Sequence, residues 1–277
     1  MPFGGLRVLS LESRRSAEIE TLIRRQGGEP FVAPSVKERA LDDEHTDAFR
    51  MLAGMEAGRF ELLVLMTGVG LKFWREVIAA RYSIGRAEEA LGKVRLLARG
   101  PKPSVVLRSA GLAPDITIPE PNTWHEIVEA IRRRPERRIA IQEYGRPNRE
   151  FVAALEQLGA QVDTFALYRW ELPEDLGPLC EAVRRLASRD VDVALFTSSI
   201  QLEHLLRIAE ERQMRAQVIE TLARDVVIGS IGPITTQELA GSGLKPDVTP
   251  SSPKMGALVL AAAEQSQTLL AAKRAPA

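Results

Sequence analysis

The sequence repeats itself with an offset of 131 to 132 residues. Residues 61–71 align with residues 192–202, and residues 8–36 align with residues 139–168. The clearest match aligns Gly100, Pro101, Leu107, Gly111, Leu112, Pro114, Asp115 and Thr117 with Gly232, Pro233, Leu239, Gly243, Leu244, Pro246, Asp247 and Thr249. Because these matches cover most of the chain, they predict a tandem duplication of one α/β unit, and therefore two similar lobes, with the seam inside residues 132–138.

Within each repeat, short apolar runs alternate with helical patterns. Amphipathic periodicity predicts helices over residues 15–26 and 148–158, each followed by a glycine, Gly27 or Gly159. The predicted strands are residues 6–11, 29–33, 62–66, 94–98, 139–142, 161–168, 193–197 and 226–231. This alternation is typical of parallel sheets with crossover helices. The sequence therefore predicts an α/β fold of two similar lobes, each a parallel sheet with flanking helices.

Composition excludes several classes of protein. The 37 basic and 37 acidic residues balance, which argues against a nucleic-acid binder or a polybasic membrane binder. Cys180 is the single cysteine, so no intrachain disulfide can form, and a cytoplasmic location is expected. The longest apolar stretches, residues 62–66 and 257–263, are too short to span a bilayer, and the N-terminus lacks a signal-peptide pattern. We expect a small-molecule partner.

The basic residues are mostly arginine, 30 against 7 lysines. Guanidinium groups bind carboxylates and phosphates well, so this bias hints at an acidic ligand. Arginine-rich usage on ordinary solvated helix faces is the stronger explanation, and the hint serves only as support.

Ligands of parallel sheets bind where strands end, so the loops after strands are the candidate sites. Thr197, Ser198 and Ser199 follow one predicted strand and precede a helix. Their hydroxyls can cap that helix or bind an anion, and capping alone is the simpler explanation. Gly232 and Thr235 open the helix after the last strand, where the glycine permits close approach and the threonine hydroxyl can reach a ligand.

Tyr168 ends a predicted strand beside a charged, proline-containing stretch. Its phenol can donate a proton or a hydrogen bond to a reacting group, and the alternative is a packed ring with its hydroxyl in water. The sequence has no dinucleotide, P-loop or nucleophile-elbow motif, and the three histidines, His45, His125 and His204, have no partner spacing. These absences favour a reaction without cofactor, metal or covalent nucleophile.

This set of features resembles the uroporphyrinogen-III synthase family. The order and spacing hold over residues 6–260. The matching parts are residues 8–28 with Pro34, Gly159 followed by Tyr168-Arg169, Asp192-Val193 followed by residues 196–199, and residues 231–235 followed by residues 243–248 and Pro250. The resemblance implies that residues 1–36 and 169–277 form lobe one and residues 37–168 form lobe two, joined by a two-stranded linker. The repeat alone predicts instead two sequential lobes divided near residue 135.

The resemblance also implies an activity. The family are lyases of tetrapyrrole, porphyrin and haem biosynthesis that cyclise linear hydroxymethylbilane, invert ring D and release uroporphyrinogen III and water, without cofactor or metal. This implies a cytoplasmic monomer with transient contact to hydroxymethylbilane synthase and no nucleic-acid or membrane partner. Tyr168 would be catalytic. The substrate-binding residues would be Thr197, Ser198, Ser199, Gly232, Thr235, Thr67, Gly68, Arg149 and Arg14.

Some positions depart from the family pattern. Arg14 is displaced from the usual Thr-Arg pair after the first strand, the Thr67-Gly68 turn lacks the usual Asn, and Lys102-Pro103 stands where a Thr is common. These departures leave an alternative, a non-catalytic two-lobed module that senses a tetrapyrrole or another acidic metabolite. The chain ends at Ala277 without room for an appended DNA-binding domain, which favours the enzyme.

Overall fold

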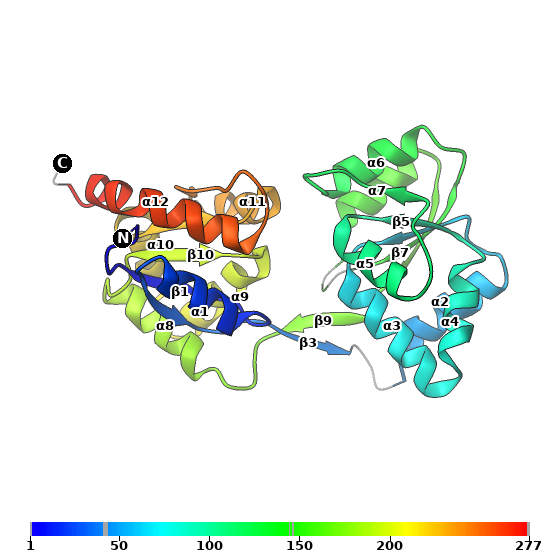
Figure 1. Ribbon diagram of the computed structural model, residues 1–277, viewed down its shortest axis with the longest axis horizontal. Helices are drawn as coiled ribbons and strands as arrows, with labels where there is room; N and C mark the ends of the chain where they lie inside the picture. The colour runs from blue at the N-terminus through cyan, green and yellow to red at the C-terminus, as the bar shows by residue number, and fades with distance from the viewer. Residues whose placement is uncertain (1, 41–43, 144, 146, 276–277) are drawn as a thin grey trace. The chain divides into compact units, whose positions relative to one another are not determined.

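A computed structural model describes residues 2–40, 44–143, 145 and 147–275 of the chain. The chain divides into two compact units (Figure 1). Unit 1 comprises Met1–Lys37 and Glu171–Ala277, and unit 2 comprises Glu38–Trp170. The strands β3 (Lys37–Ala40) and β9 (Tyr168–Glu171) pair in a two-stranded sheet where the chain passes from one unit to the other. The predicted two-stranded linker is therefore confirmed.

Unit 1 is built on a four-stranded sheet in the order β11-β10-β1-β2, with all neighbours parallel. Its strands are β1 (Arg7–Ser10), β2 (Glu29–Val32), β10 (Val193–Phe196) and β11 (Val227–Ser230). Its helices are α1 (Ser16–Arg25), α8 (Gly177–Ala187), α9 (Ser199–Glu211), α10 (Arg215–Arg224), α11 (Pro233–Gly241) and α12 (Met255–Lys273). The central strand β1 precedes the unit 2 segment in the sequence and β10 follows it, so the sheet of unit 1 joins two separate segments of the chain.

Unit 2 is built on a five-stranded parallel sheet in the order β6-β5-β4-β7-β8. Its strands are β4 (Leu62–Leu65), β5 (Arg95–Ala98), β6 (Ile116–Thr117), β7 (Arg138–Gln142) and β8 (Gln161–Phe165). Its helices are α2 (Thr46–Glu56), α3 (Gly68–Arg81), α4 (Ile84–Leu91), α5 (Pro101–Ser109), α6 (Trp124–Arg132) and α7 (Arg149–Gln157). The predicted α/β class with parallel sheets is confirmed in both units.

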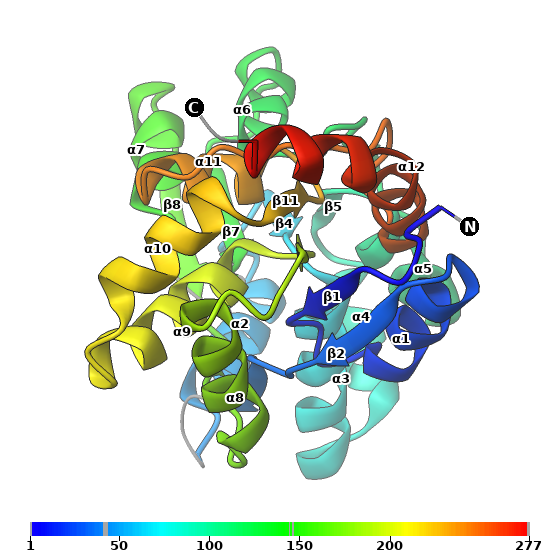
Figure 2. The same cartoon turned by 90° about the vertical axis from the view of Figure 1, so that its left-hand side faces the viewer.

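Helices cover both faces of each sheet, which explains why central strands such as β4 and β10 are apolar throughout. In β10, Val193 and Leu195 pack with α1 and α12, whereas Ala194 and Phe196 pack with α8, α9 and α10. Figure 2 shows α1 and α12 on one side of this sheet and α8 and α9 on the other. This alternation follows from the two-residue period of a strand. In unit 2, α6 and α7 cover one face, and α2 to α5 cover the other.

The duplicated sequence folds into duplicated structure. The helices α5 and α11 both begin with proline after a glycine, and each ends near a glycine with positive φ, 73° at Gly111 and 76° at Gly243. The Asp115 carboxylate accepts the backbone N–H of Leu96 at 2.7 Å, and the Asp247 carboxylate accepts that of Ile228 at 2.8 Å. The repeated aspartates therefore make equivalent hydrogen bonds to equivalent strands, β5 in unit 2 and β11 in unit 1.

Each unit combines parts of both repeats. The first repeat runs from β1 to α6 and the second from β7 to α12. Unit 1 takes β1, α1 and β2 from the first repeat and α8 to α12 from the second, and unit 2 takes the complementary parts. Val8 pairs with Val193 in unit 1, as Ile139 pairs with Leu62 in unit 2. The two units therefore do not follow one another along the chain with a division near residue 135.

The prediction of a single strand over residues 161–168 is wrong in one respect, because these residues belong to two strands. β8 ends at Phe165, and Tyr168 begins β9 of the linker. The carboxylate of Asp47 accepts the N–H of Ala166 at 2.8 Å, so that N–H is unavailable to a neighbouring strand. Tyr168 therefore lies at the start of the linker strand rather than at the end of a sheet strand.

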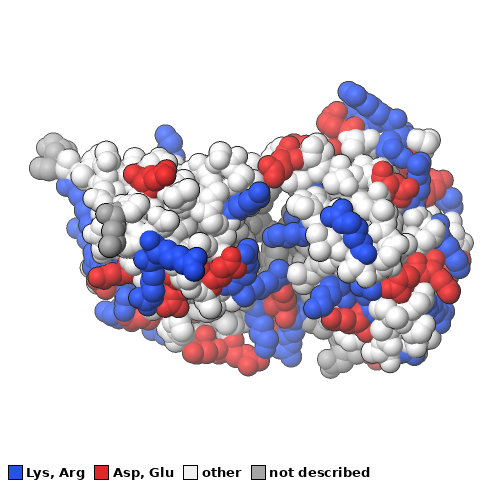
Figure 3. All heavy atoms as spheres, viewed as in Figure 1, with Lys and Arg blue, Asp and Glu red and all other residues white. Residues whose placement is uncertain are grey.

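Acidic and basic side chains are interspersed over each unit on the face seen in Figure 3. This distribution agrees with the equal numbers of the two kinds of charge. Within the described part of the chain, no helix has both the length and the apolar composition needed to cross a membrane.

An ion-pair cluster ties the two segments of unit 1 together. The backbone N–H and the guanidinium of Arg7 both donate to the Asp192 carboxylate at 2.9 Å, and Arg274 pairs with it at 3.0 Å. The Asp192 side chain is 8% exposed. Burial raises the pKa of this carboxyl, but the hydrogen bonds and charge of Arg7, together with Arg274, lower it more, to about 2. The cluster therefore stabilises the folded state in its ionised form.

We expect Asp192→Asn to lower the free energy of unfolding by about 2 kcal/mol at pH 7. The folded pKa lies below the ordinary value of 3.8. The contribution is therefore full above about pH 4 and is lost as the pH falls towards 2. Denaturant titrations of wild type and variant at pH 7 and at low pH check this, because their difference should shrink in acid.

Glu181→Gln is the matched control. Hydrogen bonds from Arg184 and Arg185 also lower the pKa of Glu181 to about 2, but its side chain is 32% exposed, against 8% for Asp192, and it links neighbours on one helix. Exposed pairs contribute little to stability, so the control should unfold like wild type. Equal losses in the two variants would contradict the role of Asp192 in joining the two chain segments.

Candidate functional site

The predicted site residues lie at the carboxyl ends of the strands, in two sets. In unit 2, Thr67 and Gly68 follow β4 and Arg149 follows β7. In unit 1, Arg14 follows β1, Thr197, Ser198 and Ser199 follow β10, and Gly232 and Thr235 follow β11. Parallel strands end at the same edge of a sheet, so each unit gathers its own set there.

The loop after β10 is held by the side chain of Gln201. The Gln201 carbonyl accepts the N–H groups of Thr197 at 2.8 Å and Ser198 at 3.3 Å, and its amide donates to the Thr197 hydroxyl at 2.8 Å. Ser198 is the N-cap of α9 and Ser199 its buried first residue. The backbone N–H groups of Thr197 and Ser198 are therefore paired with Gln201 at the start of α9.

Glu12 is a residue of this set that the sequence prediction missed. One oxygen of its carboxylate accepts the hydroxyl of Thr197 at 2.5 Å, and the other accepts the N–H of Arg15 at 3.2 Å, at the start of α1. The carboxylate therefore occupies a helix N-terminus, where an anionic ligand would otherwise bind. Arg14, in the same turn, has an exposed side chain.

The repeat could have revealed this glutamate, because it aligns Glu12 with Glu143 after β7. Glu143 is 9% exposed. Burial raises the pKa of its carboxyl, the nearby charge of Asp47 raises it further, and a hydrogen bond from the backbone N–H of Asn148 opposes them. Each unit therefore carries a glutamate at the end of the corresponding strand.

The loop after β11 is more enclosed than the sequence suggested. Gly232 has an extended backbone with φ of 171°, and a Cβ there would lie 3.6 Å from Pro253, so neither strain nor crowding demands a glycine. Thr235 is only 3% exposed. The hydroxyl of Thr236 lies 2.9 Å from that of Ser230, inside unit 1. Packing therefore accounts for much of this loop.

In unit 2, the structure brings two predicted residues together. The hydroxyl of Thr67 lies 3.2 Å from the hydroxyl of Tyr168. Thr67 is the N-cap of α3, and its hydroxyl accepts the N–H of Gly70 at 3.0 Å. Tyr168 is 4% exposed, with its ring in the core formed by α2, α3 and α4. The ring is packed, as the alternative for Tyr168 predicted, and its hydroxyl lies beside that of Thr67.

The other two residues of unit 2 differ in exposure. A Cβ on Gly68 would lie 2.8 Å from the carbonyl oxygen of Lys102, so the glycine lets α3 pack against α5. Arg149 is exposed at the first position of α7, whose N-cap Asn148 accepts the N–H of Phe151 at 3.0 Å. Arg149 is thus placed to meet a ligand, whereas packing explains Gly68.

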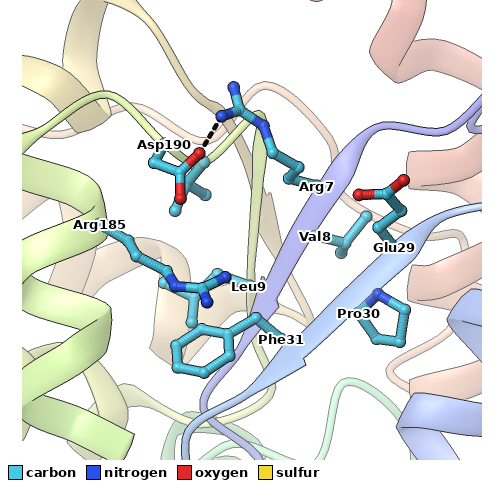
Figure 4. Close-up of a pocket in the computed structure, with 9 residues that line it drawn as sticks. Arg7, Val8, Leu9, Glu29, Pro30, Phe31, Arg185 and Asp190 are labelled. Carbon is cyan, nitrogen blue, oxygen red and sulfur yellow. Dashed lines mark hydrogen bonds and ion pairs between the residues drawn. The ribbon is translucent and has the colours of Figure 1, made fainter.

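The predicted residues do not line the pocket shown in Figure 4, which has a volume of about 320 Å³. It lies in unit 1 at the amino ends of β1 and β2. Arg7 there pairs with Asp190, and Arg185 stacks on Phe31 at 4.1 Å and pairs with Glu181. The two arginines of this pocket are therefore already paired within the protein.

Metal and histidine chemistry find no support in the described ranges. No group of three or more His, Cys, Asp or Glu side chains there is arranged to hold a metal ion. His204 lies with Nδ1 2.6 Å from the carbonyl oxygen of Ser35, and His125 stacks on Trp124 with ring centroids 3.8 Å apart. These two histidines serve packing.

Comparisons with known proteins all indicate the same family. Residues 17–260 match the family model described as uroporphyrinogen-III synthase HemD. A protein of Methanothermobacter thermautotrophicus named "Putative uroporphyrinogen-III synthase" is 30% identical over 236 residues, which cover 83% of this chain and 87% of that protein.

Solved structures share the fold. A mutant uroporphyrinogen III synthase of Thermus thermophilus is similar with a TM-score of 0.71 at 23% identity, covering 92% of this chain and 96% of that one. The uroporphyrinogen-III synthetase of Helicobacter pylori is similar with a TM-score of 0.56 at 12% identity, covering 95% and 99%. Since the family model also matches most of its length, this chain belongs to the uroporphyrinogen-III synthase family.

Proposed function

We propose that this protein is a uroporphyrinogen-III synthase, a lyase that cyclises hydroxymethylbilane with inversion of ring D and releases uroporphyrinogen III and water. The observation that carries the proposal is the buried phenol of Tyr168 beside the hydroxyl of Thr67, in a chain of this family. A phenol held against a second hydroxyl is suited to deliver a proton to a leaving hydroxyl.

Tyr168 acts as the acid in the first step. Its proton moves to the terminal hydroxyl of the substrate, the carbon–oxygen bond breaks, and water leaves a protonated azafulvene cation beside the phenolate. Ring D attacks this cation to form the spiro intermediate. The bond from ring D to its original methylene bridge then breaks, and the other α-carbon of ring D closes onto that bridge. The proton released when this pyrrole regains aromaticity returns to the phenolate. Atoms and charge balance over the cycle, and the chemistry consumes no cofactor or metal. Holding the bilane folded suppresses the spontaneous closure.

The carboxylates of the substrate need donors at the strand ends. In unit 1, Arg14 is exposed, the side chains of Thr197 and Ser198 are partly exposed, and the Gly232 backbone opens α11. In unit 2, Arg149 is exposed. We assign these groups to carboxylate binding, since guanidinium and hydroxyl groups and helix starts all favour anions. Ser199, Thr235 and Gly68 support these loops by packing.

We also propose that the protein works as a cytoplasmic monomer. It would receive hydroxymethylbilane through transient contact with the synthase that makes it, since the bilane cyclises spontaneously when free. The single cysteine suits a reducing compartment, and the balanced charge gives no reason to expect a nucleic-acid or membrane partner.

Turnover of hydroxymethylbilane tests the proposal. We expect Tyr168→Phe to lower kcat on the order of 100-fold, because the acid is lost. Stability should fall by no more than about 1 kcal/mol, because the buried ring remains. Tyr82→Phe is the control, since Tyr82 is 46% exposed at the end of α3. Wild-type kcat in Tyr168→Phe would remove Tyr168 from the mechanism.

Glu12 should weaken binding of an acidic substrate. Its carboxylate engages the Thr197 hydroxyl and places negative charge beside Arg14. We expect Glu12→Gln to lower KM about fivefold, or about 1 kcal/mol, because the repulsion disappears while an acceptor oxygen remains. Glu20→Gln, which removes a charge paired with Arg24 on α1, should leave KM unchanged. An unchanged or higher KM in Glu12→Gln would contradict this placement of the site.

A further inference from the structure

Thr67 links a helix start to the candidate acid. It is the N-cap of α3 with an extended backbone, φ −145° and ψ 145°. Its hydroxyl oxygen accepts the N–H of Gly70 at 3.0 Å and lies 3.2 Å from the phenol oxygen of Tyr168, 101 residues away in sequence. A single hydroxyl therefore contacts both the α3 N-terminus and the phenol.

The number of protons on these groups decides which hydroxyl donates the hydrogen bond between Thr67 and Tyr168. A threonine hydroxyl has one proton to donate and two lone pairs to accept with, and Gly70 already occupies one lone pair. Once Tyr168 has given up its proton, the phenolate oxygen can only accept. The Thr67 hydroxyl must then be the donor in this contact. The chain of donors runs from Gly70 N–H to Thr67 O–H to the phenolate of Tyr168.

This chain stabilises the phenolate more than the neutral phenol. Hydrogen bonds to a charged acceptor are roughly twice as strong as those between neutral groups. Consecutive bonds polarise one another, so the N–H of Gly70 makes the Thr67 hydroxyl a better donor. The N-terminus of α3, a helix of 14 residues, adds partial positive charge at the same place. Such a preference for the charged form lowers the barrier to proton donation.

The Thr67 turn is fixed from a second side. The N–H of Thr67 donates to the carbonyl of the Gln142 side chain at 3.2 Å, and the Gln142 amide donates to the carbonyl of Glu143. Gln142 is fully buried. A Cβ on Gly70 would lie 2.2 Å from the Gln142 amide nitrogen, so glycine at this position makes room for it. The backbone of the Thr67 turn is therefore fixed by contacts within unit 2.

We propose that Thr67 is a positioning residue that orients Tyr168 and donates a hydrogen bond to its phenolate as the proton leaves. This assignment rests on the proposed function, because it takes Tyr168 as the acid. It replaces the expectation that Thr67 binds a substrate carboxylate directly. It predicts that Thr67 affects kcat rather than KM.

Thr67→Val and Thr67→Ser test the assignment. Valine keeps the shape of the side chain without a hydroxyl, and serine restores the hydroxyl. We expect Thr67→Val to lower kcat about tenfold with little change in KM, and Thr67→Ser to stay within about twofold of wild type. Ser83→Ala controls for loss of a helix cap, because Ser83 caps α4 by accepting the N–H of Arg86 at 3.2 Å.

A titration without substrate separates this inference from the proposed function. The ultraviolet absorbance of phenolate is followed against pH, and the curve of the matching Tyr168→Phe variant is subtracted to isolate Tyr168. We expect the midpoint to rise by about one pH unit in Thr67→Val and to return in Thr67→Ser. An unchanged midpoint in Thr67→Val overturns the inference whether or not the protein is active. A shifted midpoint with unchanged kcat also overturns it, since the contact would then not serve turnover.

Discussion

The parallel pairing of β1 with β10 is the constraint on which the rest of the structure depends. The two strands of this pair are separated in the sequence by the whole of unit 2. The equivalent pairing of β4 with β7 closes unit 2. As a result, loops from both repeats lie at the carboxyl edge of each sheet. Glu12 of the first repeat meets Thr197 of the second, and Thr67 of the first meets Tyr168 of the second. Exchange between repeats therefore brings these side chains together in both units.

The two repeats use different side chains to accept the backbone N–H at the start of the equivalent helix. The N–H groups of Thr67 and Ser198 occupy the same place in the repeat, and each needs an acceptor. In unit 2 the acceptor is Gln142, from the neighbouring strand, and Gly70 leaves room for it. In unit 1 it is Gln201, which stands where Gly70 stands in the other repeat. In unit 2 the Thr67 hydroxyl lies beside a phenol, whereas in unit 1 the hydroxyl of Thr197, one position earlier in the repeat, contacts a carboxylate.

Much of the fold was predictable from local pattern. Buried parallel strands are continuous apolar runs, so β1, β4, β7, β10 and β11 were evident. The polar linker strand β3 has no such pattern, and its pairing depends on the return of the chain. The break between β8 and β9 depends on Asp47, which is distant in sequence. The exchange of segments between units came from the family resemblance, because a repeat does not specify which copies pair.

The site was predictable as a set of loops but not as a set of contacts. Strand ends identified Thr67, Thr197 and Arg149, whereas nothing local connects Thr67 with Tyr168 or Thr197 with Glu12. The most direct test of the account is the isomer that forms when the purified protein receives hydroxymethylbilane generated in situ. The products are oxidised and the uroporphyrin isomers separated. We expect mainly isomer III, whereas isomer I alone, the spontaneous product, would contradict the proposed function and favour a non-catalytic binding module.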